Sequence, residues 1–454
     1  MTHTAKNPFK DKALSSLLIK FSAPAVAGMF ANALYNIISR IYVGQDVGAE
    51  GLAGITLLFP LGLIYMGFSA LIGVGSNSLF SIRLGEKKTE EARFILGNGF
   101  VLLTLVSGVL TILSYLFLDP ILALLGADTQ VLPLARAYAQ VVFPGYFLFG
   151  IGAGMNHFIR SSGRPKTAMA TQLIGAFINF VFAPIFIFGF HWGMRGAAAA
   201  TVLGQLISFG WVMWFFLRGN TLYRLHLIYC RLQKQIVLGC LAIGFSQFAF
   251  QLASSALNFI LNHALLKYGG NVAVSAMGIA VSVNTLILMP LLGISQGAQP
   301  LIGYNYGARK YKTAIQTLKM AIRWGMGITT TGFILIELFA TPIAAVFNNQ
   351  DIALVRMAAH TLRILNILLP LIPLQVLATS FFQAVNHPAK AAFLSLSRQV
   401  LLVIPLVLIL PLFFQLEGVF YAPVVADAIS TCLAIYMLHV FFAKHGLRLF
   451  RRQK

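Results

Sequence analysis

The fold of this chain is decided by two similar stretches, GVGSNSLFSIRLGEKKTEEA at residues 73–92 and GISQGAQPLIGYNYGARKYKTA at residues 293–314. In each, an apolar run with small residues ends at a glycine and is followed by basic residues, so that Gly85 aligns with Gly307. That pattern is typical of an apolar helix that ends at a cytoplasmic membrane surface. Its recurrence indicates that the chain consists of two homologous halves.

A second pair of stretches repeats at nearly the same spacing: NHFIRSSGRPKTA lies over SFFQAVNHPAKAA, with Pro165 on Pro388. Because the shift covers an even number of membrane crossings, both halves keep the same orientation. The repeat is therefore parallel, about an axis along the membrane normal, and two such halves that rock about a midplane site are the architecture of alternating access. We predict an N-terminal lobe of residues 1–230 and a C-terminal lobe of residues 231–454.

The composition requires a membrane. Of the 454 residues, 58% are hydrophobic and 10% are charged, whereas a soluble domain averages about a quarter charged residues. Since a spanning helix needs about 20 mostly apolar residues, we predict an all-α membrane protein with twelve transmembrane helices in two pseudo-symmetric six-helix bundles. The predicted spans are residues 16–44, 51–82, 95–117, 131–157, 167–190, 196–217, 235–266, 272–303, 319–347, 355–384, 390–414 and 417–442.

The net charge of +21 sorts by membrane side. Most lysines and arginines fall in the two tails and in the even-numbered connections, which the positive-inside rule places in the cytoplasm. We therefore predict a multi-pass protein of the bacterial inner (plasma) membrane with both termini cytoplasmic and no nucleic-acid partner. Three distant cysteines, Cys230, Cys240 and Cys432, form no C-x-x-C pair, so we expect neither a disulfide framework nor a metal site.

Enzyme signatures do not explain the sequence. It contains no H-E-x-x-H metal motif and no G-x-x-x-x-G-K-[ST] phosphate loop. We therefore predict a transporter that is not an enzyme, has no cofactor and is not driven by ATP on this chain.

A coupled carrier needs ionisable groups inside the membrane, where each charge costs about 2.5–3.5 kcal/mol and survives only at a cavity or beside a partner. Only Asp427 and Glu337 among the acids fall within predicted spans. Asp427 could hold a proton or a cation, or it could pair with Arg398 for structure. Glu337 could serve in coupling, or it could have a fixed partner or snorkel towards the interface. His263 could titrate near neutral pH, or it could be a packing residue between helices.

Polar residues at helical spacing indicate either a cavity lining or helix contacts. Tyr35, Asn36 and Ser39 share one face of the first span with Asn32. The second half offers amides in its first two spans that could bind substrate or hold helices together, namely Gln251, Asn258, Gln296 and Gln299.

Several motifs resemble the multidrug and toxic compound extrusion (MATE) family, in its bacterial drug-exporter branch. They are YNIISRIYVG, IGVGSNSLFSIRLGEKK, NHFIRSSGRPKTAM, INFVFAPIFIFGFHWGMRGAAAATV and GISQGAQPLIGYNYGARK. The resemblance implies a V-shaped pair of six-helix bundles that exports amphiphilic, often cationic drugs in exchange for protons or sodium. It also places a cation site in the first lobe, at positions filled here by Tyr35, Asn156, Asn179 and Thr201.

Two acids that the family usually supplies are missing. Its N-I-V-D motif reads Asn-Ile-Ile-Ser here and ends at Ser39, and its N-x-x-x-D-P motif carries Ala183 in place of aspartate. Neither side chain can carry the charge that binds a proton or sodium ion.

Three functions follow in order of preference. The first is a monomeric exporter of amphiphilic compounds with a displaced coupling site. The alternative is a flippase or exporter of lipid-linked or anionic molecules, which the missing acids and the arginines within spans favour. A membrane scaffold without transport comes last, because polar stripes and bending prolines are typical of a central cavity.

Overall fold

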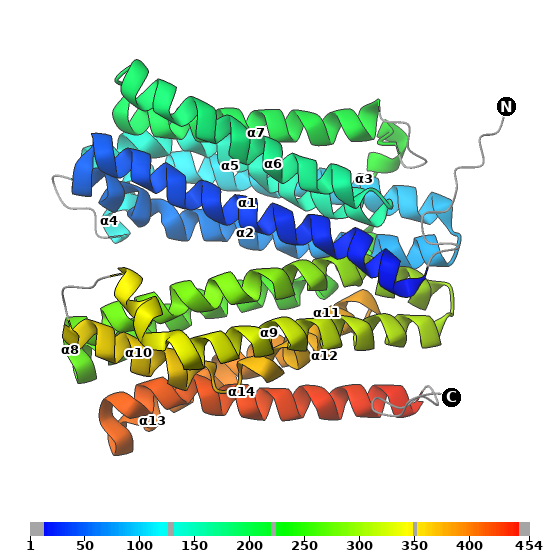
Figure 1. The fold of residues 1–454 in the computed structure, drawn as a ribbon. Coiled ribbons are helices and arrows are strands. Elements are labelled where there is room, and N and C mark those ends of the chain that lie inside the picture. Colours follow the sequence, from blue (N-terminus) through cyan, green and yellow to red (C-terminus); the bar gives the residue numbers. More distant parts are fainter. Residues whose placement is uncertain (1–12, 126–130, 219–223, 348–351, 445–454) are drawn as a thin grey trace. The chain divides into compact units, whose positions relative to one another are not determined.

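The protein is all-helical in the part of the chain described by the computed structural model, residues 13–125, 131–218, 224–347 and 352–444. Among these residues, eleven helices are long and apolar enough to cross a membrane. The helices of the N-terminal half run side by side along one direction (Figure 1). A few side chains within these ranges, including those of residues 32–41, lie outside the description.

The chain divides into two compact units, Met1–Phe248 and Ala249–Lys454. The first contains α1 (Leu14–Asp46), α2 (Gly48–Gly85), α3 (Thr89–Leu116), α4 (Leu118–Leu124), α5 (Val131–Ser161), α6 (Pro165–Pro184), η1 (Ile185–Gly189), α7 (Gly193–Leu217), η2 (Leu227–Cys230) and the first turns of α8 (Lys234–Gly307). The second contains the rest of α8, α9 (Tyr311–Phe347), α10 (Ile352–Asn366), η3 (Leu369–Leu371), α11 (Ile372–Ala384), α12 (Pro388–Leu396), η4 (Ser397–Val403), α13 (Ile404–Ile409) and α14 (Pro411–Lys444). The predicted boundary after residue 230 stays a prediction about the sequence repeat.

The predicted span 131–157 forms α5 (Val131–Ser161) but is not one of the eleven apolar helices. Its sequence mixes Arg136, His157 and Arg160 with apolar residues, which lowers its hydropathy. This helix contacts α2, α3, α6 and α7, and most of its second half is buried. A helix enclosed by protein can carry polar groups that lipid would exclude.

Backbone hydrogen bonds confirm the repeat. The residues after α2 and α8, Lys87 and Arg309, both have a positive φ, of 61° and 58°. Beside each, two hydrogen bonds close a Schellman turn, from Lys88 N to Arg83 O and from Lys310 N to Asn305 O among them. The helix ends before Pro165 and Pro388 repeat the turn at Gly163 and Asn386. Equivalent helices in the two halves thus end in the same way.

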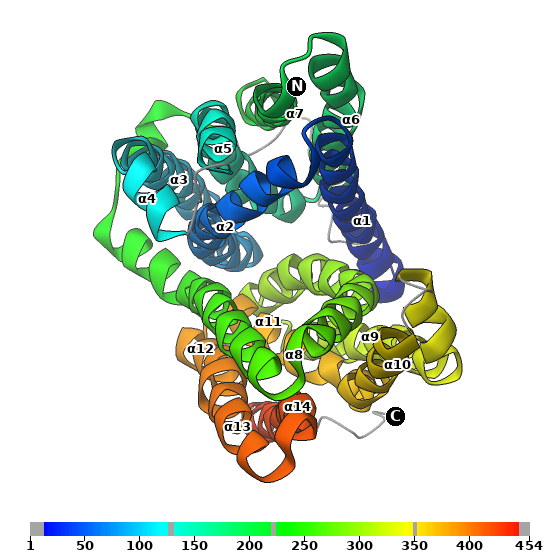
Figure 2. The same ribbon diagram turned by 90° about the vertical axis from the view of Figure 1, so that its left-hand side faces the viewer.

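Glycines bring the start of α8 against α2 inside the first unit. A Cβ at Gly75 would lie 1.9 Å from the Cys240 carbonyl oxygen, and one at Gly244 would lie 1.6 Å from the Leu71 carbonyl oxygen. Small residues allow this close backbone approach, which is a principal source of helix association in membranes. The end-on view in Figure 2 shows the helices of this unit grouped together.

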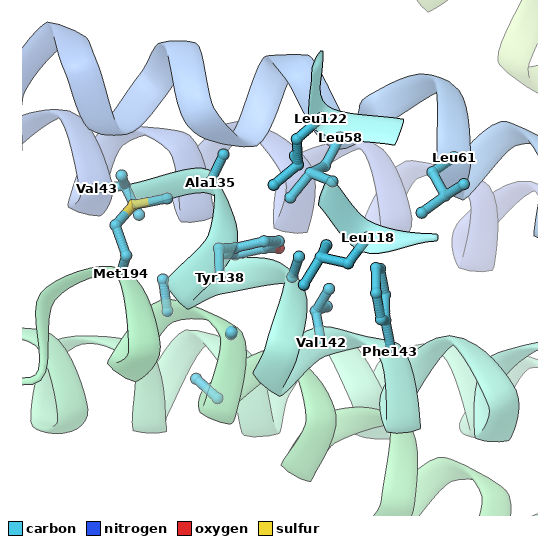
Figure 3. Packing of buried hydrophobic residues seen from close by; sticks show 14 of the residues in the cluster. Val43, Leu58, Leu61, Leu118, Leu122, Ala135, Tyr138, Val142, Phe143 and Met194 are labelled. Atoms are coloured by element: carbon cyan, nitrogen blue, oxygen red, sulfur yellow. The ribbon is translucent and has the colours of Figure 1, made fainter. Parts of the chain in front are cut away.

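An apolar cluster joins α2, α4, α5 and α7 at one end of the first unit. Tyr138, Phe143, Leu118 and Leu122 are among its buried members (Figure 3). Phe143 also packs edge to face with Tyr115, with ring centroids 5.1 Å apart. Tyr138 and Phe143 both lie on α5, more than one turn apart, so the cluster extends along this helix.

In the second unit the long helices are interrupted at defined positions. Gly270 (φ 65°) separates the two limbs of α8, and Gln415 (φ 50°) bends the start of α14. The span built from α12, η4 and α13 contains a π-helical stretch, Ser397–Val403. Such stretches are rare and often lie at functional sites.

We predict that Gly75→Ala destabilises the protein by about 1–3 kcal/mol, because its methyl group would overlap the Cys240 carbonyl and force the helices apart. Gly210→Ala is the control, since its Cβ would meet nothing within 4 Å. Thermal unfolding in detergent measures the difference. Equal melting temperatures for the two variants would show that the α2 and α8 backbones do not touch there.

Candidate functional site

Asn179 and Thr201 form the centre of the polar interior in the first unit. Both are buried, and the Asn179 Nδ2 donates to Thr201 Oγ1 at 3.2 Å. The Thr201 hydroxyl in turn donates to the Ala197 carbonyl at 3.0 Å. Gly175 and Gly204 let α6 and α7 approach closely beside this pair. The structure therefore brings together two of the residues that the sequence selected from different helices.

Asn156 is held separately, by the start of α6 and by its own helix. Its Nδ2 donates to the Ala168 carbonyl at 2.9 Å, and its Oδ1 accepts from Arg160 Nη2 at 3.3 Å. Arg160 is only 4% exposed. The sequence pattern assigned this arginine to a cytoplasmic connection, and its burial in the last turn of α5 could not be read from charge alone.

Ala183 follows Asn179 by one helical turn and is a buried member of the apolar cluster that contains Tyr138 and Phe143. Ala197 and Met194 belong to the same cluster. The position at which the family resemblance led us to expect a carboxylate therefore belongs to an apolar cluster. The side chains of Tyr35, Asn36 and Ser39 lie outside the described residues.

The second unit carries a row of amides and hydroxyls between α8 and α11. Ser295 and Ser380 share a hydrogen bond of 2.5 Å, and the Gln299 amide lies 3.5 Å from Gln383 Oε1. Gln296 lies in the same part of α8 and is half-buried. Ser295 lies within GISQG, which formally matches the G-x-S-x-G nucleophile pattern. It is in the interior of a helix, whereas that pattern requires a strand-to-helix turn.

Gln251 and Asn258 lie in the first limb of α8. Gln251 is half-buried and Asn258 is exposed. The Asn258 amide donates to the Ser254 carbonyl of its own helix at 2.9 Å. Such back-bonding satisfies a polar side chain on an apolar face.

Asp427 and Arg398 form an ion pair between α14 and the π-helical stretch η4. The Asp427 side chain is 6% exposed and that of Arg398 is 25% exposed. The pairing considered from the sequence is therefore present. Beside Arg398, the Gln399 Nε2 donates to Ser254 Oγ at 2.9 Å, while Gln399 Oε1 and Ser430 Oγ are buried acceptors with no hydrogen-bond partner within the described chain.

The other ionisable candidates have different surroundings. Glu337 is half-buried and His263 is exposed, and neither forms an ion pair within the described ranges. An ion pair missed by the sequence reading joins His360 Nε2 and Glu417 Oε1 at 2.8 Å. Both side chains are about half exposed, and no sequence signal links residues so far apart.

Charge therefore differs between the two interiors. Within the described residues, Asp427 is the only buried carboxylate, and it lies in the second unit. The first unit buries Arg160 and several neutral amides. The buried groups of the first unit in its described part are therefore neutral or positively charged, whereas a cation site needs negative charge or oxygen ligands.

This combination of long apolar helices, a duplicated bundle and polar groups facing the helix interfaces defines a polytopic membrane protein of the transporter class. The family model described as MatE matches residues 24–185 and 243–409, one stretch in each half. The chain therefore belongs to the MatE family of membrane transporters and is not an enzyme, as its motifs predicted.

Similar proteins cover almost the whole chain. The multidrug export protein MepA of Staphylococcus saprophyticus is 27% identical over 95% of both chains, and MepA of Staphylococcus aureus strain N315 is 27% identical over the same shares. A MATE structure in complex with MaL6 is 25% identical, with a TM-score of 0.90 over 96% of this chain and 98% of that one. An outward-facing multidrug resistance MATE transporter, 24% identical, has a TM-score of 0.91 over 99% and 100% and supports the fold.

A further solved structure is a MOP-superfamily transporter from Pyrococcus furiosus. It is 26% identical, with a TM-score of 0.88 over 96% of this chain and 97% of that one. A reversed polarity of its binding pocket suggests a different function for that protein.

We predict that Asp427→Asn destabilises the protein by about 2–3 kcal/mol, because it leaves the Arg398 charge unpaired at a mostly buried position. This is below the 3–5 kcal/mol typical of full burial, since a quarter of the Arg398 side chain reaches the surface. The double variant Asp427→Asn/Arg398→Gln should regain most of the loss. Thermal unfolding of the single and double variants measures the coupling, and additive losses would contradict the ion pair.

Proposed function

We propose that this chain is a secondary multidrug exporter, with proton antiport through Asp427. It moves amphiphilic, mainly cationic compounds by alternating access and works as a monomer with cytoplasmic termini. The observation that carries the proposal is the burial of Asp427, the sole buried carboxylate of the described chain. The names of the relatives, multidrug export proteins, support the substrate class.

The Arg398 partner suggests how proton and substrate exclude each other. While Asp427 is charged, the pair is neutral overall and its desolvation is offset by mutual attraction. When a proton neutralises Asp427, the Arg398 charge is no longer balanced and repels a cationic substrate. A protonated state without substrate and a deprotonated state that tolerates a cation are the two conditions that antiport requires.

The surroundings of the pair favour a proton over sodium. The guanidinium already occupies one carboxylate oxygen of Asp427, and sodium would have to compete with it for oxygen ligands. The unpartnered acceptors Gln399 Oε1 and Ser430 Oγ lie on the same two elements. They can accept hydrogen bonds from the arginine or from water when the pair separates.

The energy available is sufficient for accumulation against a gradient. Because one proton exchanged for one monovalent cation moves no net charge, the pH gradient drives the exchange, and one pH unit supplies about 1.4 kcal/mol, a roughly ten-fold concentration ratio. Without coupling the same protein would only equilibrate its substrate across the membrane.

A second function, export or flipping of anionic or lipid-linked molecules, is favoured by one observation. The first unit buries Arg160 but, in its described part, no carboxylate. In the Pyrococcus furiosus relative, a reversed polarity of the binding pocket suggests a different function. This is a reason to test anionic as well as cationic substrates.

The test is ethidium efflux from proteoliposomes under an imposed pH gradient. We expect uphill efflux by the natural protein and at least a tenfold lower gradient-driven rate for Asp427→Asn/Arg398→Gln, which removes both charges and should fold. The matched control is His360→Gln/Glu417→Gln, which removes an exposed ion pair from the same unit and should leave efflux unchanged.

Each outcome separates the two functions. Gradient-driven efflux that survives the double variant would remove Asp427 from coupling. If no cation moves under a proton or sodium gradient, while an anionic amphiphile raises the melting temperature through Arg160, the anionic function replaces the proposal. Loss of that stabilisation in Arg160→Gln, with unchanged unfolding in the absence of ligand, would locate the anion site.

A further inference from the structure

The connection between the halves is fixed to the side of α3. After α7, the Leu225 amide donates to the Phe216 carbonyl at 3.0 Å. The Tyr229 hydroxyl then donates to Glu90 Oε2 at 3.0 Å and accepts from Arg93 Nη1 at 3.2 Å. The Leu225 contact attaches the connection to α7, and the Tyr229 contacts attach η2 to α3.

One buried amide holds the backbone that follows η2. Asn98 Nδ2 donates to the Arg231 carbonyl at 3.0 Å, and its Oδ1 accepts from the Gln233 amide at 2.8 Å. A Cβ at Gly97 would lie 2.2 Å from the Tyr229 carbonyl oxygen. The connection therefore lies directly on the α3 backbone, in a fixed position.

The connection contacts α3 well inside the helix and not at its first residue. Phe94, Gly97 and Asn98 lie one to three turns inside α3, which begins at Thr89. The connection thus runs along the flank of the bundle and not beyond the end of α3. A rise of 1.5 Å per residue places it roughly 7–14 Å along the helix from that end.

The connection carries exposed apolar and exposed cationic side chains within eight residues. Leu227 is 93% exposed and Ile228 is 73% exposed. Arg231 and Lys234 are also exposed and form no ion pair within the described residues. Exposed apolar residues next to unpaired cations are typical of segments that bind anionic membranes.

We propose that residues 227–234 form a binding site for an anionic phospholipid of the adjoining leaflet, which the positive-inside pattern makes cytoplasmic. The acyl chain lies against Leu227 and Ile228, and Arg231 and Lys234 bind the headgroup phosphate. The charge complementarity and the fixed backbone carry the assignment. A site held by Asn98 and Tyr229 requires little ordering when the lipid arrives.

The experiment measures thermal unfolding of the full chain in a neutral detergent, titrated with phosphatidylglycerol or phosphatidylcholine. We expect phosphatidylglycerol alone to stabilise the natural protein. Because each cation near an anionic surface contributes about five-fold in affinity, Arg231→Gln/Lys234→Gln should need roughly thirty-fold more lipid. Leu227→Ser/Ile228→Ser should also weaken the response, without loss of folding because both side chains are exposed.

Matched controls remove the same chemistry elsewhere. Arg356→Gln/Arg363→Gln removes two exposed cations, and Val346→Ser/Phe413→Ser removes two exposed apolar side chains. Both should respond to phosphatidylglycerol as the natural protein does. An unchanged response of the 231/234 variant, an equal loss in the controls, or equal stabilisation by inorganic phosphate would each overturn the proposal.

Discussion

The constraint behind this structure is that hydrocarbon offers no hydrogen bonds. Every backbone amide and carbonyl in a span must find its partner within the protein, and the chain responds with long helices such as α2, which has 38 residues. Helices that are already satisfied gain little from apolar contact with one another, because lipid is equally apolar. Close backbone approach then decides which helices pair, and glycines such as Gly75 and Gly244 permit it. The polar interior follows from the same constraint, since Asn179 and Thr201 satisfy each other across the interface between α6 and α7.

Much of this architecture could be predicted from sequence, because the relevant signals are local. Apolar length gave the spans, and the recurring glycine and proline patterns gave the repeat, which the Schellman turns at Lys87 and Arg309 confirm. Hydropathy alone is insufficient for α5, which carries polar residues because protein encloses it. The family assignment from motifs is confirmed, while the ion coupling and the substrate remain proposals.

The candidate site was less predictable, because it depends on contacts between distant residues. The pairing of Arg398 with Asp427 could be anticipated, since few charges enter the spans and each needs a partner. The burial of Arg160 and the role of Asn98 could not, because an amide or arginine near a helix end looks the same whether it faces water or protein. Tyr35, Asn36 and Ser39 keep their predicted roles as proposals. Among the described residues, the first unit buries neutral amides and Arg160, whereas the second buries one carboxylate, that of Asp427.

The glycine contacts of α8 also bear on where the chain divides into two halves. The first turns of α8, up to Phe248, belong to the packing unit of the first half, although the repeat assigns them to the second. The boundary of the sequence repeat and the boundary of the packing unit therefore do not coincide. A half transporter expressed alone would therefore need residues beyond the repeat boundary, up to about Phe248, to cover Leu71 and Gly75 on α2.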